Sequence, residues 1–476
     1  MEKPRTDRRA RASAACDACR VRKVKCVLSN EAKCVMCKEL DIECTSERPR
    51  KKRGPKNRYV QALRAQLDGE AAPDAPGSEQ HDLVMIAPLD VLHRIIDDWF
   101  DWIHPVAPAL HRGLFLERLN GSQTSDRDHS TTFLLLVASV CAATVASLRR
   151  RRHNYGEVTV EACLELAEHH KLWSSSSPIT LDRALTLYNF SSAVHHEHGI
   201  DSPLSFRLSA ESAISIKYLI HHQLDQMTFI EQQLLKRIYW LIFAGQCTGD
   251  LHGRRLLVLH HAHESIAGLL PVAATDEELL HGPVSTPIEV QSPDWSYVSG
   301  LNELSRLFLI WQSSQAVPVQ TLENLQTHLS RAHLTLSELP PELCWAEQSN
   351  APSSFGFNVQ KVNLKVTQLH IRSNLLEQMN TLAKEQGFRI TPDAIINERH
   401  LVVEELLEVL YTMPEEVFDA NGYSIVPKIR DIGSALFDEL RTGSHGRNLQ
   451  ASITLDKLLA KLETLDIRPM GQSSYL

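Results

Sequence analysis

The sequence of 476 residues lacks the short motifs that mark common enzyme active sites. It has no P-loop, no Gly-x-Gly-x-x-Gly turn, no Gly-x-Ser-x-Gly nucleophile elbow and no His-Glu-x-x-His zinc site. Aromatic residues are scarce, at 6%, although the hydrophobic content of 43% is ordinary for a chain with a folded core. We therefore expect a folded protein that is not an enzyme.

Long apolar runs are equally scarce. Residues 131–148 form one run of 18 residues without a charge, which is followed by four arginines at 149–152. This length is at the short end for a membrane span, and Ser139 and Thr144 interrupt the run, so we predict a buried helix. The first 15 residues are rich in arginine and have no apolar core. We therefore expect neither a secretory leader nor a membrane partner.

Charge is distributed unevenly along the chain. Residues 1–67 carry 19 Lys and Arg against 8 Asp and Glu, a net charge of +11, whereas the remainder carries 31 against 50, a net charge of −19. The length predicts at least two folded units. A basic head on an acidic body indicates that the head meets a polyanion and the body does not.

Cysteine is concentrated in one short segment. Six of the ten cysteines lie between residues 16 and 44, and they repeat one pattern twice: a Cys-x-x-Cys pair, then a third cysteine after six more residues. Clustered thiols in a chain without a secretory leader are typical of metal ligands rather than of disulfides. The predicted metal ligands are Cys16, Cys19, Cys26, Cys34, Cys37 and Cys44.

The number of thiolates constrains the metal. Six thiolates cannot fill two separate tetrahedra, which need eight ligand positions, unless two sulfurs are shared. Two bridging thiolates give a closed cluster, and the predicted cofactor is therefore two Zn²⁺ per chain. A metal-storage or redox cluster is the alternative. Arg20, Arg22, Lys23 and Lys25 lie between the second and third cysteines and favour DNA binding, because a metal store needs no row of cations.

The segments CDACRVRKVKC and CVMCKELDIEC, within residues 16–44, resemble the fungal binuclear zinc cluster family of transcription regulators. The resemblance implies that Cys16 and Cys34 bridge the two metals. It also implies that Lys23 reads bases in CGG-type triplets while its basic neighbours contact phosphate. A lysine at a helix C-terminus can donate to guanine O6 and N7 in the major groove, and the other cations make the affinity depend on salt.

The predicted DNA contacts are cations of the cluster and of the linker that follows it: Arg20, Arg22, Lys23, Lys25, Lys38, Arg50, Lys51, Lys52 and Arg53. Residues 48–56 (RPRKKRGPK) also have the composition of a nuclear localisation signal. Its residues would be Arg50, Lys51, Lys52, Arg53 and Lys56. A linker that merely follows the phosphate backbone is the alternative, and both roles can hold together.

From residue 83 onward, apolar residues recur at helical spacing, as in Val91, Ile95 and Trp99. Three segments resemble the middle homology region of the fungal-specific regulatory domain: residues 88–105, which begin PLDVLHRIIDDW, residues 232–254 (QQLLKRIYWLIFAGQCTGDLHGR) and residues 270–279 (LPVAATDEEL). This resemblance implies an all-α regulatory domain. The predicted fold class is a small metal-stabilised zinc binuclear cluster domain plus a large all-α regulatory domain.

Three features of the body have two interpretations each. Arg237, Trp240 and Phe243 recur at i, i+3 and i+6, and we favour core packing over a ligand site. The histidine clusters at 195–198 and 260–263 lack the i, i+4 spacing of metal ligands, so we expect a solvated surface. Acidic residues between 404 and 419 alternate with apolar residues at a helical period, which favours an amphipathic helix over an activation segment.

These observations predict a nuclear, sequence-specific DNA-binding transcription regulator of RNA polymerase II genes. Its expected partners are double-stranded DNA with CGG-type triplets, a second copy of the chain on DNA, and the transcription machinery or coregulators. Its length and single regulatory domain are similar to those of pathway-specific activators of fungal biosynthetic gene clusters for secondary metabolism. A repressor is one alternative. Another is a ligand-binding or scaffold protein whose zinc cluster contacts protein rather than DNA.

The predicted organisation has seven segments, given in chain order: a basic arm (1–15), the zinc cluster (16–44), a basic linker (45–58), a short dimerisation helix (59–67), a flexible linker (68–82), the regulatory domain (83–466) and a tail (467–476).

The dimerisation helix is short. Val60, Leu63 and Leu67 span about one and a half heptads, and helices below about 12–15 residues are marginal in water. We therefore expect a fragment of residues 1–70 to sediment as a monomer without DNA, so that pairing requires two DNA half-sites or the body, where a leucine stripe at 455–465 is a candidate surface. A stable dimer of this fragment at micromolar concentration would contradict the prediction.

Overall fold

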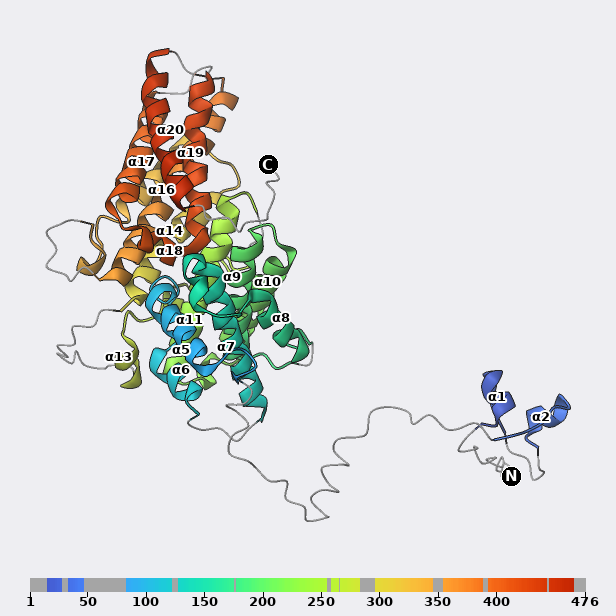
Figure 1. The fold of residues 1–476 in the computed structure, drawn as a ribbon. Helices are drawn as coiled ribbons and strands as arrows, with labels where there is room; N and C mark the ends of the chain where they lie inside the picture. Colours follow the sequence, from blue (N-terminus) through green and yellow to red (C-terminus); the bar gives the residue numbers. More distant parts are fainter. Residues whose placement is uncertain are drawn as a thin grey trace, which may run out of the picture. The chain divides into compact units, whose positions relative to one another are not determined.

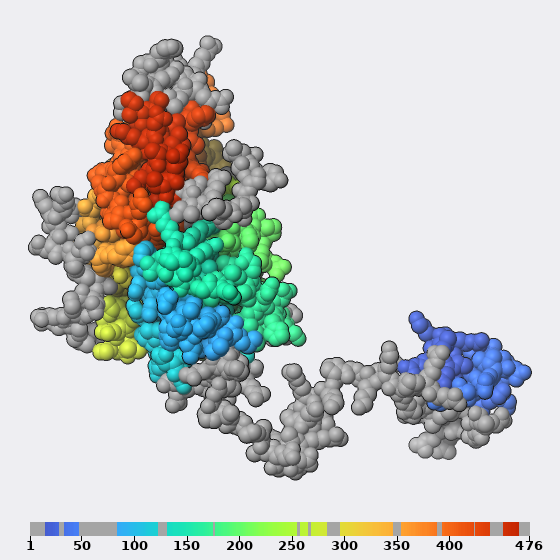
Figure 2. All heavy atoms as spheres, in the orientation of Figure 1, coloured from blue at the N-terminus to red at the C-terminus, as the bar shows by residue number. Residues whose placement is uncertain are grey.

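The chain divides into two units, Met1–Pro76 and Gly77–Leu476, each described here by itself (Figure 1 and Figure 2). The computed structural model describes residues 15–27, 33–46, 83–121, 127–174, 177–254, 258–264, 266–282, 296–345, 354–387, 393–442 and 445–465. The predicted dimerisation helix, most of the basic arm and of the two linkers, and the C-terminal tail lie outside these residues.

The described residues of the first unit form two one-turn helices, α1 (Asp17–Val21) and α2 (Val35–Glu39). Its core consists of sulfur instead of carbon side chains: Cys16, Cys19, Cys34 and Cys37 are its buried residues, with 0–6% of each exposed. A segment as short as residues 16–44 cannot bury enough apolar surface to fold by itself. The first unit therefore needs another source of stability.

Throughout the described part of the second unit the regular elements are helices, which confirms the predicted all-α class. They are α5 (Leu89–Asp98), the π-helical η1 (Trp99–Ile103), α6 (Arg112–Leu119), α7 (Arg127–Ser147), η2 (Arg149–Asn154), α8 (Val160–His169), α9 (Leu181–His198), α10 (Pro203–His222), η3 (Leu224–Gln226), α11 (Phe229–Leu251), α12 (Ile266–Leu269), α13 (Asp276–Leu280), α14 (Val298–Gln315), α15 (Leu322–Leu334), η4 (Pro341–Leu343), α16 (Phe355–Glu385), α17 (Asp393–Thr412), α18 (Glu415–Asn421), η5 (Gly422–Ser424), α19 (Ile425–Thr442) and α20 (His445–Leu465).

The charge-free run forms α7, a buried helix as predicted. All residues from 133 to 146 are buried, and α7 packs against α5, α8 and α9. Its polar side chains are satisfied within the helix, because the hydroxyls of Ser139 and Thr144 donate to the carbonyls of Leu136 and Val140 at 2.7 and 2.8 Å. Among the described helices, none combines the length and the hydropathy that a membrane span requires.

The arginines that follow α7 join helices of the second unit to one another. Arg151 donates to both carboxylate oxygens of Asp98 on α5, at 3.0 and 2.7 Å. Arg150 pairs with Glu415 of α18 at 3.1 Å. A basic run that would flank a membrane span in another protein therefore serves here as an internal set of ion pairs.

The 31-residue helix α16 runs between the later helices and packs against α14, α15, α17, α18 and α19. Figure 1 shows α16, α17, α19 and α20 side by side at one end of this unit. On α17, Glu405 accepts from Lys365 at 2.5 Å and from Arg372 at 2.9 Å, both on α16. The acidic segment therefore belongs to helices that pack in the core, although it is divided between α17 and α18 instead of forming the single helix predicted.

The leucine stripe near the C-terminus is partly buried within the chain. Leu458 is fully buried and Leu462 is 9% exposed, and both belong to the core formed with α19. The approach is close, since a Cβ added to Gly433 of α19 would lie 2.6 Å from Leu458 Cδ2. Leu459 of the same stripe is 48% exposed, so only part of the stripe is covered within one chain, and its role in pairing stays a prediction.

The histidine clusters are also less exposed than predicted. His196 is buried, and its Nδ1 lies 2.7 Å from the carbonyl oxygen of Ser192. His195 is partly buried on the same helix, whereas His198 is exposed. The spacing argument could not reveal that the end of α9 is enclosed by η5.

Two of the three segments that resembled the regulatory domain meet at Asp276. Arg237 of α11 is 1% exposed, and its guanidinium donates to Asp276 at 3.2 Å. The other carboxylate oxygen of Asp276 accepts from the backbone N–H of Arg112 at 2.7 Å. Trp240 Nε1 donates to the carbonyl of Leu269 at 2.9 Å, so Arg237 and Trp240 are core residues, as predicted.

This arrangement makes Asp276 the acidic partner of a buried cation. Asp276→Asn should lower the free energy of unfolding by about 2–3 kcal/mol, because it leaves the Arg237 charge buried and uncompensated. Urea unfolding of the full chain measures the change. A matched control is Asp201→Asn, which breaks the exposed pair with Arg254 and should change stability by about 0.5 kcal/mol or less. Equal effects of the two variants would contradict the prediction.

Candidate metal centre and nucleic-acid interface

The two halves of the cysteine segment fold in the same way. Cys16 and Cys34 occupy the N-cap positions of α1 and α2, and Cys19 and Cys37 lie one turn further on, buried. The chain then returns, and the backbone N–H groups of Cys16 and Cys34 point to the sulfurs of the third cysteine of each half, at 3.5 and 3.4 Å. The repeated spacing therefore brings three sulfurs together in each half.

The sulfurs form two groups of four, and the groups share two members. One group contains Cys16, Cys19, Cys26 and Cys34, and the other contains Cys16, Cys34, Cys37 and Cys44. Within each group all sulfurs lie within 4.8 Å of one another, and the Cys16–Cys34 distance is 3.7 Å. This is the donor set that two tetrahedral metals with two bridging thiolates require, so the residues present fit two zinc ions.

The six thiols also need the two zinc ions for electrostatic reasons. Burial raises the pKa of the Cys37 thiol to about 12, and it raises the pKa of the Cys19 thiol as well. Because adjacent thiolates repel one another, several cannot ionise at pH 7 without a cation between them. Zinc binding therefore releases protons and supplies folding free energy to a unit that has almost no carbon core.

Each one-turn helix ends in the same tight turn. Lys23 and Asp41 follow the C-caps of α1 and α2 and adopt left-handed conformations, with φ of 55° and 46°. The next N–H group in each half bonds back to the helix, from Val24 to the Cys19 carbonyl at 3.1 Å and from Ile42 to the Cys37 carbonyl at 3.0 Å. The two halves thus place opposite charges at equivalent positions.

The cations of the first half lie on the surface. Arg20, Arg22, Lys23 and Lys25 are exposed, and Lys38 is exposed on α2. The left-handed turn directs the chain back toward Cys26 directly after Lys23. The remaining predicted contacts and the localisation signal, Arg50, Lys51, Lys52, Arg53 and Lys56, lie outside the described residues.

The sequence did not reveal one cluster in the second unit. Asp431 of α19 accepts from His252, which follows α11, at 2.6 Å, and from His370 of α16 at 3.1 Å. Burial alone would raise the pKa of Asp431, but these two hydrogen bonds hold that pKa well below its usual range. The three residues are far apart in the sequence, so no local spacing could have indicated that they join three helices.

Residues 14–53 match the model of the fungal Zn(2)-Cys(6) binuclear cluster domain. This segment is therefore a binuclear zinc cluster domain, a class that binds two zinc ions through six cysteines.

The similarity to known regulators extends over most of the chain. The chain is 23% identical to the maltose fermentation regulatory protein MAL33 of Saccharomyces cerevisiae, covering 92% of this chain and 87% of that protein. It is 23% identical to MAL63, covering 92% of this chain and 88% of that protein. It is 22% identical to MAL13, covering 92% of this chain and 86% of that protein. Both are named as maltose fermentation regulatory proteins of the same species. No solved structure matches the chain significantly.

We predict that the purified chain holds two zinc ions, and that Cys34→Ala loses both, because this sulfur belongs to both groups. Structural zinc contributes about 10–16 kcal/mol of apparent binding energy to small fingers, so the first unit should unfold while the helical signal of the second persists. Elemental analysis and far-ultraviolet circular dichroism measure these outcomes. Cys247→Ala, a buried cysteine of α11, is the control and should retain both ions. One zinc ion in the wild-type chain would contradict the shared-thiolate arrangement.

Proposed function

We propose that this protein is a sequence-specific, DNA-binding regulator of transcription whose zinc cluster reads CGG-type half-sites. The observation that carries the proposal is the pair of sulfur groups sharing Cys16 and Cys34, with four exposed cations beside it. Similarity over 92% of the chain to proteins named as regulators supports the same conclusion. In this proposal Cys16 and Cys34 bridge the metals, and the remaining four cysteines each bind one metal.

Lys23 is the proposed base-reading residue. It follows the C-terminal end of α1, is exposed, and lies at the point where the chain turns away from the helix. An ammonium group there can donate to guanine O6 and N7 in the major groove. Arg20, Arg22, Lys25 and the more distant cations would contact phosphate and orient the unit without reading sequence.

The proposal also covers where the protein acts, how it pairs and which genes it controls. We propose that the protein acts in the nucleus, pairs on DNA through residues 59–67, recruits coregulators and activates the genes of one pathway. The linker at 45–58 would set the separation of half-sites, at about 3.3 Å per extended residue. The regulators named above are associated with maltose fermentation, so carbohydrate genes are an alternative to the biosynthetic gene cluster that the sequence suggested.

The residue roles can be tested on the full chain. Lys23→Ala should cost about 1–3 kcal/mol on a CGG-containing duplex and reduce the ratio of specific to scrambled binding. Alanine keeps a Cβ in the left-handed turn, so the comparison isolates the loss of the ammonium group. Fluorescence anisotropy over a range of salt concentrations provides both quantities.

Arg22→Ala is the matched control. It should weaken all duplexes alike and reduce the slope of log affinity against log salt by about 0.9. An unchanged specificity ratio in Lys23→Ala would refute the base-reading role. Absence of any preference for CGG-containing DNA in the wild-type chain would instead favour a cluster that contacts protein.

A further inference from the structure

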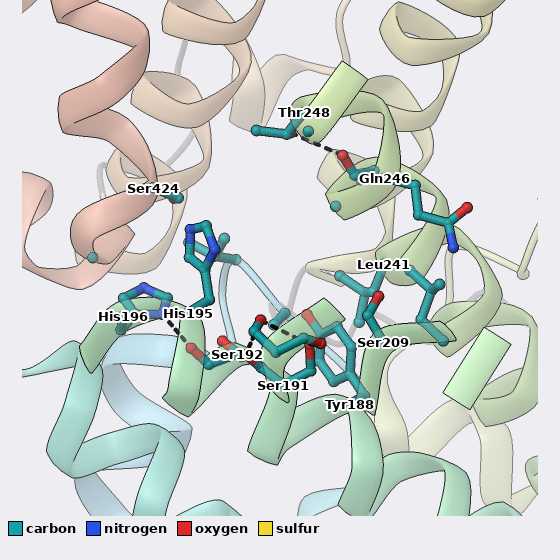
Figure 3. Close-up of a pocket in the computed structure, with 18 of the residues that line it drawn as sticks. Tyr188, Ser191, Ser192, His195, His196, Ser209, Leu241, Gln246, Thr248 and Ser424 are labelled. Atoms are coloured by element: carbon teal, nitrogen blue, oxygen red, sulfur yellow. Dashed lines mark hydrogen bonds between the residues drawn. The ribbon is translucent and has the colours of Figure 1, made fainter. Parts of the chain in front are cut away.

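The second unit contains a cavity of about 300 Å³ between its early and late helices. Residues of α9, α10 and α11 line one side, and η5 and α19 contribute the other. Figure 3 shows His195 and Ser192 of α9 facing the space between Ser424 of η5 and Thr248 of α11. These elements come from parts of the sequence more than 170 positions apart, so the cavity exists only in the folded unit.

The wall of the cavity is largely apolar by area, and eight of its residues carry hydroxyl groups. Tyr188, Phe206 and Phe308 provide aromatic surface, and Ser192 and Ser209 provide hydroxyls. Cavities of this size and character, apolar with a few polar groups, are typical of sites for small organic molecules.

One charged group in the wall lacks an acidic partner. Lys428 of α19 is 4% exposed, and its ammonium donates to the Thr367 hydroxyl at 2.8 Å. The Thr367 hydroxyl in turn lies 3.3 Å from Asn363 Oδ1. Among the described residues that line the cavity there is no aspartate or glutamate. An ammonium has three donors, so one bond to a neutral hydroxyl leaves its charge uncompensated.

Arg254 and His195, which also line the cavity, do not carry an unpaired positive charge. Arg254 makes two hydrogen bonds to Asp201, at 2.9 and 2.7 Å. Burial lowers the pKa of His195 to about 4, so its ring is neutral at pH 7. Burial also lowers the pKa of Lys428, to about 8, which still leaves it mostly protonated at pH 7. Lys428 therefore gives the cavity a net positive charge.

We propose that this cavity binds a small organic anion, with its carboxylate or similar group on Lys428 and its apolar body against the aromatic wall. Such a ligand would supply the negative charge that the wall lacks and would connect α9–α11 with α19. The inference concerns the helical unit alone. It goes beyond DNA binding, and its failure would leave the zinc cluster and its DNA contacts unaffected.

Two fluorescent probes of similar shape and different charge test the proposal on the full chain. The anionic probe is 8-anilinonaphthalene-1-sulfonate, and the neutral probe is N-phenyl-1-naphthylamine. We expect the anionic probe to bind the wild-type chain with one-to-one stoichiometry. Lys428→Met should weaken the anionic probe about tenfold or more and leave the neutral probe nearly unchanged.

A second variant tests the location. Gly245 of α11 lines the cavity, and a Cβ added there meets no heavy atom within 4 Å. Gly245→Leu is designed to place a branched side chain at the cavity wall, and it replaces glycine within a helix, which favours folding. It should abolish binding of both probes while far-ultraviolet circular dichroism remains that of the wild type.

Each other outcome overturns the proposal. Equal binding of the anionic probe by Lys428→Met would exclude the anion site, and unchanged binding by Gly245→Leu would place the probes elsewhere. Failure of the wild-type chain to bind either probe would refute a ligand site. Displacement of both probes by maltose, independently of Lys428, would identify a site for neutral sugars instead of anions.

Discussion

The first unit depends on the compensation of six thiolates packed into a core that has little else. The two zinc ions that these cysteines bind would neutralise most of that charge and replace the missing apolar surface, and the two sulfur groups that share Cys16 and Cys34 fit such a pair. The remaining features follow from this constraint. Each half must turn sharply after one helical turn to return its third cysteine, and the turn places Lys23 and Asp41 in left-handed conformations on the surface.

The second unit compensates buried charge with paired side chains. Arg237 is matched by Asp276, and Arg372 by Glu405 and Glu398, although both guanidinium groups are almost fully buried. Such pairs add little net stability, but they are costly to break, so they fix which helices pack together. Against this background Lys428, buried beside a cavity without an acidic partner, is the exception that suggests a ligand.

Ligand binding in the cavity would act on a different part of the helical unit from the one around Asp276. Two of the segments that resemble the regulatory domain meet at Asp276, whereas the cavity lies between α9–α11 and α19. A ligand in the cavity would add to the contacts between early and late helices, which include the Arg150–Glu415 pair and the triad of His252, His370 and Asp431. A small molecule could thereby change the stability of the helical unit by mass action.

The sequence by itself determined the metal centre, because six cysteines at repeated short spacings converge through local backbone geometry. It also determined the all-α class and the buried helix at 131–148, since apolar periodicity and the lack of charge are local properties. Tertiary structure alone decided the rest. The stripe at Leu458 and Leu462 is covered by α19, and His196 is enclosed at the end of α9. Nothing near Lys428 in the sequence distinguishes it from a surface lysine, because its burial, its neutral partner and the cavity arise from helices far apart in the chain.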